Sequence, residues 1–193
     1  MSAHEILRQI QYKLQSYYGL EQGPDVREYV RFEGERETLL VREGEDVLEV
    51  SLVLPDLSRA GLTHRDLHSD SGLQFIEGVS HFLYIVERAR TELPVTQLEL
   101  ELQAEVDKFV FLSLDHPDPA RAPKRLCQHL YEQVRYLHPA GSELGDRYRT
   151  ANSLAARFVA RLNTDLGSEP VKRQLRRFYR SGQTEKLSLA RAA

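Results

Sequence analysis

The chain has little cysteine and no long apolar run. Its one cysteine, Cys127, cannot form an internal disulfide, and secreted proteins usually carry cysteines in even numbers. The first twenty residues lack the continuous apolar core of a signal peptide, because polar side chains such as Arg8 and Lys13 interrupt it. No stretch approaches the ~18 consecutive apolar residues of a membrane-spanning helix. We therefore expect a cytoplasmic protein without a membrane span.

Neither sign of charge dominates. The chain has 26 basic and 29 acidic side chains, a formal net charge of -3. This value favours solubility but is too small to indicate wholesale binding to nucleic acid or to a membrane surface. The length of 193 residues and the 41% hydrophobic content fit an ordinary globular protein. We expect one globular domain over residues 1–193.

The sequence also lacks the common catalytic and cofactor motifs. It has no phosphate-binding Walker loop, no GxGxxG, no GxSxG and no paired CxxC. Cys127 falls in an apolar stripe with Leu130 and Val134, a position typical of a core thiol rather than a nucleophile. We therefore expect no cofactor, with a divalent metal ion as the alternative.

The N-terminal part predicts one helix followed by a small sheet. Ser2 and Glu5 have the spacing of a capping box, and apolar residues recur at helical intervals, so residues 3–18 should form a helix. Three short runs rich in valine, leucine and aromatics then follow, separated by turns that contain glycine. We interpret residues 26–54 as a three-stranded antiparallel meander.

The remainder predicts helices. Residues 95–114 are ambiguous, because their leucines alternate as in a strand but also fit one helical face; the length favours a helix. The expected helices cover 71–93, 95–114, 123–137, 142–163 and 170–181, followed by a short C-terminal tail. The expected fold class is α+β, mostly α, with a bundle-like helical core and the small meander near the N-terminus.

The first candidate for chemistry lies on the helix expected at 71–93. Glu77 and His81 are four residues apart on the side opposite its apolar stripe, so both could reach one metal ion or one proton-transfer partner. The plainer alternative is a solvated polar face with an ordinary helical ion pair.

The second candidate is Glu105, which projects among leucines and phenylalanine if 95–114 is a helix, with Glu101 one turn earlier. An inward-facing carboxylate is costly unless it is paired or binds a metal. Its partner could be Lys108, or an Arg or His on the preceding helix. The catalytic version combines Glu77, His81, Glu101 and Glu105 in a metal or acid/base site between the two helices.

The third candidate is the C-terminal helix, whose basic side chains are Lys172, Arg173, Arg176, Arg177 and Arg180. From Thr164 onward seven basic residues oppose three acidic ones. Such a helix could bind an acidic protein partner or nucleic acid phosphates, or could balance the acidic residues of the meander and of the 97–107 segment within the same fold.

The functional hypothesis from the sequence is a non-enzymatic interaction or regulatory module that engages an acidic protein, or else nucleic acid, through its C-terminal helix. The alternative is a metal-dependent or acid/base enzyme, such as a hydrolase. A homodimer would be compatible with either hypothesis.

Overall fold

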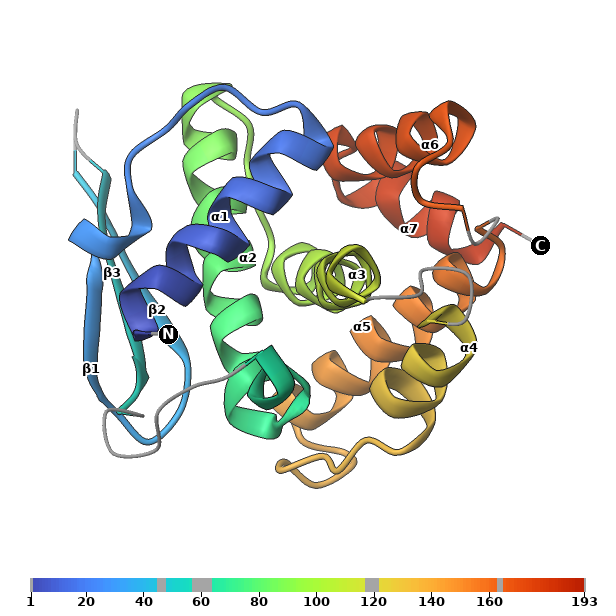
Figure 1. Ribbon diagram of the computed structural model, residues 1–193, viewed down its shortest axis with the longest axis horizontal. Helices are drawn as coiled ribbons and strands as arrows, with labels where there is room; N and C mark the ends of the chain where they lie inside the picture. The colour runs from blue at the N-terminus through green and yellow to red at the C-terminus, as the bar shows by residue number, and fades with distance from the viewer. Residues whose placement is uncertain (1, 45–47, 57–63, 117–121, 163–164, 193) are drawn as a thin grey trace. The chain divides into compact units, whose positions relative to one another are not determined.

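The computed structural model describes residues 2–44, 48–56, 64–116, 122–162 and 165–192 of the chain. The structure is mostly helical and contains a small three-stranded mixed sheet (Figure 1). The chain divides into two compact units, unit 1 (Met1–Leu93) and unit 2 (Pro94–Ala193). The expectation of one domain stays a prediction. Among the described helices, none combines the length and apolar character that crossing a bilayer requires.

Unit 1 holds the sheet and two long helices. Its elements are α1 (Ala3–Tyr18), the 3-10 turn η1 (Val26–Glu28), β1 (Val30–Gly34), β2 (Thr38–Glu43), β3 (Leu48–Pro55), the 3-10 turn η2 (His64–His68) and α2 (Asp70–Arg90). The predicted bounds of α1 are confirmed. Ser2 and Glu5 form the expected capping box, and Gly19 ends the helix in the left-handed conformation with φ 65°. α2 is capped by Ser69, whose hydroxyl accepts a hydrogen bond from the Gly72 N–H.

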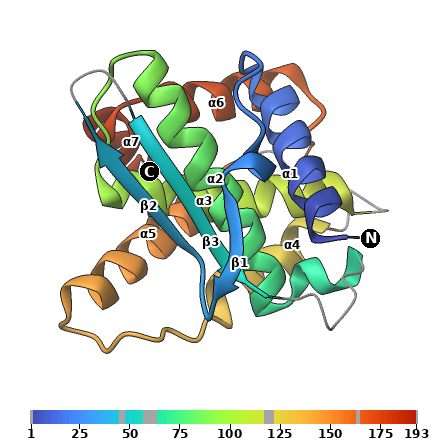
Figure 2. The same cartoon turned by 90° about the vertical axis from the view of Figure 1, so that its left-hand side faces the viewer.

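The predicted antiparallel meander is wrong. The strand order is β1-β3-β2, with β1 parallel and β2 antiparallel to β3 (Figure 2). β3 takes the centre because it has the most buried side chains of the three strands, including Leu52 and Leu54 at 0% exposure. In addition, residues 26–28 turn as a 3-10 helix, so β1 begins only at Val30.

The core of unit 1 lies between the sheet and the two helices. α2 contacts α1 and β3, and its apolar side chains Phe75, Ile76, Val79 and Phe82 are fully buried. Gly78 permits the close approach of β3, because a Cβ at this position would lie 2.8 Å from Leu52 Cδ1 and 3.1 Å from Leu54 Cδ2. The helix therefore packs directly on the central strand.

Unit 2 is helical. Its elements are α3 (Gln97–Asp115), α4 (Ala122–Cys127), the π-helical turn η3 (Gln128–Glu132), α5 (Glu143–Ala160), α6 (Glu169–Arg180) and α7 (Gln183–Arg191). The ambiguous segment 95–114 is a helix, as predicted, with a capping box of Thr96 and Glu99. α3 packs against α5, whose Ala151 and Ala155 are fully buried, in agreement with the close approach that small residues allow.

Two predicted ends in unit 2 are wrong. The helix expected at 123–137 stops at Glu132, after a π-turn in which the Leu130 carbonyl accepts a hydrogen bond from Asn152 Nδ2 at 3.0 Å. Leu137, the last residue of the predicted helix, is 60% exposed. The expected C-terminal tail is instead the helix α7, which is fixed to the unit by the fully buried Lys186.

Candidate metal centre

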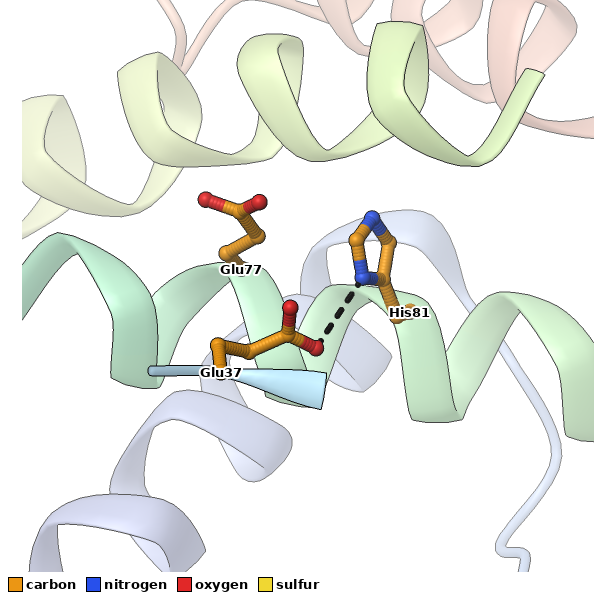
Figure 3. Close-up of side chains that lie close together, drawn as sticks. All are labelled: Glu37, Glu77 and His81. Carbon is orange, nitrogen blue, oxygen red and sulfur yellow. Dashed lines mark hydrogen bonds and ion pairs between the residues drawn. The ribbon is translucent and has the colours of Figure 1, made fainter. Parts of the chain in front are cut away.

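Three side chains that can bind a metal come together in unit 1. α2 carries Glu77 and His81 one turn apart, as the sequence predicted. The third side chain is that of Glu37, the residue just before β2 (Figure 3). Each of the three offers one ligand atom, and these atoms lie within 4.8 Å of one another. The alternative of a solvated face is wrong for His81, because this residue is buried.

Glu37 is held against α2 by its backbone as well as by its side chain. The Glu37 N–H donates to Gln74 Oε1 at 2.8 Å, and the neighbouring Arg36 lies 3.4 Å from the Asp70 carboxylate. Gly78 leaves the space that the Glu37 side chain occupies, since a Cβ there would be 3.2 Å from Glu37 Cγ. Gln74 and Gly78 therefore position the Glu37 carboxylate over the turn of α2 that carries Glu77 and His81.

The contact between Glu37 and His81 sets the state of the imidazole. His81 Nδ1 lies 3.2 Å from Glu37 Oε1, and the two side chains are only 7% and 8% exposed. An ionised carboxylate can only accept a hydrogen bond, so Nδ1 carries the proton. Without a bound ion, a neutral His81 then has its lone pair on Nε2, and an ion that binds both Glu37 and His81 has to take the place of the Nδ1 proton.

The charges of the three groups suit a divalent cation. Two carboxylates in a region screened from water repel each other, and burial makes each charge costly. One divalent ion would balance both negative charges while a neutral imidazole supplies a third ligand. A tetrahedral ion with ligands at about 2.1 Å holds them about 3.4 Å apart, so the three atoms need to close by no more than about 1.4 Å.

The other two residues of the predicted four-residue site lie in unit 2. Glu105 Oε1 accepts a hydrogen bond from Lys108 Nζ at 2.8 Å, one of the partners that the sequence left open, and its Oε2 accepts one from Asn152 at 3.0 Å. Glu101 lies 3.9 Å from Arg147 Nε. A single site formed by Glu77, His81, Glu101 and Glu105 stays a prediction.

Glu37 is the site residue that sequence reasoning missed. It is 44 positions from His81, and it falls between a turn and a strand, where an exposed glutamate is ordinary. No local pattern identifies it. Only the packing of the β1–β2 connection on α2 brings it to the site.

The basic residues predicted to bind a partner are confirmed to share α6. Arg173, Arg177 and Arg180 are exposed, whereas Lys172 and Arg176 are half-buried. Lys172 forms an ion pair with Glu169 at 3.1 Å within the same helix, rather than with the meander or the 97–107 segment. Arg177 likewise binds Glu185 of α7 at 2.8 Å.

Cys127 is half-buried at the end of α4, and burial raises the pKa of its thiol. A raised pKa leaves less thiolate at neutral pH, so this cysteine is not activated as a nucleophile.

No protein-family model matches the chain, and no curated protein or solved structure matches it either.

Proposed function

We propose that the chain binds one divalent transition-metal ion through Glu37, Glu77 and His81 in unit 1. The observation that supports this proposal is the clustering of two carboxylates and one imidazole within 4.8 Å, contributed by two segments far apart in the sequence. Mixed oxygen and nitrogen ligands favour Mn²⁺, Fe²⁺ or Zn²⁺ over Ca²⁺, which prefers oxygen ligands alone.

The reaction class that such a centre supports is metal-dependent acid/base chemistry such as hydrolysis. Three protein ligands leave at least one coordination position for water, and a bound Zn²⁺ lowers the pKa of that water to near 7. In this proposal the ion replaces the proton on His81 Nδ1, the ring nitrogen that faces Glu37, so metal binding releases a proton.

The test is metal binding by protein prepared without a nickel affinity step. Titration calorimetry with Zn²⁺ and Mn²⁺ should give one site per chain, and ligand at 100 times Kd should add about 2.7 kcal/mol to the free energy of unfolding. The variants E37Q, E77Q and H81N should each weaken binding at least about tenfold.

The matched control is E101Q/E105Q, which removes two carboxylates of α3 in unit 2. This variant should bind the ion as the unchanged protein does, since α3 supplies no ligand in the proposal. Absence of binding, or equal binding by H81N, would mean that Glu37 and His81 form only a structural ion pair between α2 and the β1–β2 connection.

As a second function, we propose that unit 2 is an interaction module that uses α6. Support comes from the exposure of Arg173, Arg177 and Arg180 on one helix. Deleting the helix is not a suitable test, because its inner side buries Leu175 and Phe178 at 0% exposure and their loss would unfold the unit. Charge-changing substitutions on its outer side avoid that difficulty.

A further inference from the structure

The exposed arginines of α6 form one stripe. Arg173, Arg177 and Arg180 follow steps of four and three residues, which place them on the same side of a helix over about 10 Å. From Thr164 onward the chain has four more positive than negative charges, whereas the rest carries a net charge of -7. The stripe is thus a local basic surface on an otherwise acidic chain.

The fold holds this arginine stripe in a fixed orientation. The opposite side of α6 is buried, and Phe178 stacks on Phe158 of α5 with ring centroids 4.1 Å apart. In the middle of the stripe, Arg177 donates from Nε and Nη2 to Glu185 Oε1 at 2.9 and 2.8 Å. The Nη1 edge of its guanidinium takes no part in that pair. Less side-chain freedom is therefore lost when the stripe binds a partner.

We propose that the arginine stripe binds an acidic helical segment of a partner protein, with carboxylates at i, i+4 and i+7. This inference rests on the interaction function proposed above for α6. The guanidinium fork pairs with a carboxylate through two parallel hydrogen bonds, and the partner spacing repeats that of the three arginines.

An acidic helix fits this surface better than nucleic acid does. Both aromatic residues of α6, Phe178 and Tyr179, are buried, so α6 offers no ring on which a base could stack. A long polyanion would also be repelled by the net charge of -7 on the rest of the chain. A short segment with three or four carboxylates avoids most of that repulsion.

The experiment is an NMR titration of the full chain with two alanine-rich helical peptides of identical composition. One peptide carries three glutamates at i, i+4 and i+7, and the other distributes them around the helix. The first should shift the amide signals of α6 and bind several-fold more tightly than the second, and the shifts should vanish near ~0.5 M salt.

The test variant is R173E/R180E, which leaves the Arg177–Glu185 pair in place. It should weaken binding of the matched peptide by about tenfold or more, since two pairs are lost and two repulsions are added. The control is R8E/R31E, which makes the same change in net charge at two exposed arginines of unit 1 and should bind normally. Circular dichroism should show the same helical content in both variants.

The outcomes separate the two proposals. Equal binding of the two peptides, or equal weakening by the two variants, overturns the arginine stripe as a specific acidic-helix site. Binding of a fifteen-nucleotide thymidine strand that only R173E/R180E abolishes, without peptide binding, overturns the partner class and keeps α6 as the interaction surface. If neither probe shifts any α6 signal, the interaction function itself fails.

Discussion

Gly78 joins the packing of unit 1 to its candidate metal centre, so the substitution Gly78→Ala tests both together. The added Cβ would lie 2.8 Å from Leu52 Cδ1, 3.1 Å from Leu54 Cδ2 and 3.2 Å from Glu37 Cγ. Leu52 and Leu54 are fully buried in the central strand and cannot move freely. The strain should therefore pass to β3 and to the Glu37 side chain.

Two opposing effects set the magnitude. Alanine in place of glycine inside a helix stabilises it by about 1 kcal/mol, whereas overpacking a closely packed core costs about 1–3 kcal/mol. Three contacts below normal van der Waals distance place Gly78→Ala in the upper part of that range. We expect a net loss of about 1–2 kcal/mol in the free energy of unfolding, and weaker Zn²⁺ binding because Glu37 is displaced.

The assay is urea unfolding together with Zn²⁺ titration of the same preparations. The double variant G78A/L52V removes the nearest methyl group, so it should be more stable than the sum of the two single changes predicts. A Gly78→Ala protein that is at least as stable as the unchanged chain and binds Zn²⁺ equally well would refute the reasoning.

Two further predictions concern buried and paired charges. Lys186 is fully buried, donates to Gln103 Oε1 at 2.6 Å and lies 4.7 Å from the centre of the Phe178 ring. Lys186→Ala should lower the unfolding free energy by about 3–5 kcal/mol. Lys186→Met should lower it by only about 1–3 kcal/mol, because methionine refills the space. Equal losses for the two variants in urea unfolding would contradict this account. The Arg27 guanidinium lowers the pKa of Asp25 in the folded protein to about 2. The pair therefore stabilises the fold fully at pH values above the pKa that Asp25 has in the unfolded chain, and this stability is lost as the pH falls through 2. At neutral pH, Asp25→Asn should cost about 1 kcal/mol after allowance for solvent screening, and unfolding between pH 5 and 2 should depend less on pH than in the unchanged chain.

Local signals predicted the helices well. The capping box of Ser2 and Glu5 and the glycine at position 19 define both ends of α1 without help from the rest of the fold. The helix over 95–114 followed from its length and composition, although its leucines also alternate. The inward-facing Glu105 and its pair with Lys108 could be predicted too, because both depend on positions within one helix.

Features that depend on packing could not be predicted. Alternating apolar residues mark a strand but do not say which strand is central, so the order β1-β3-β2 was missed. α7 was missed because its inner side is built around Lys186, and lysine is normally exposed. In the candidate metal centre, Glu77 and His81 share one helix face and were predicted, whereas Glu37 reaches them only through the tertiary fold.

The central claim is that Glu37, Glu77 and His81 bind one metal ion, and X-ray absorption spectroscopy of the Zn²⁺-loaded protein tests it most directly. We predict one imidazole nitrogen and carboxylate oxygens at about 2.0–2.2 Å, no sulfur ligand, and loss of the imidazole signal in H81N. A spectrum without imidazole, or one that H81N leaves unchanged, would contradict the proposed centre.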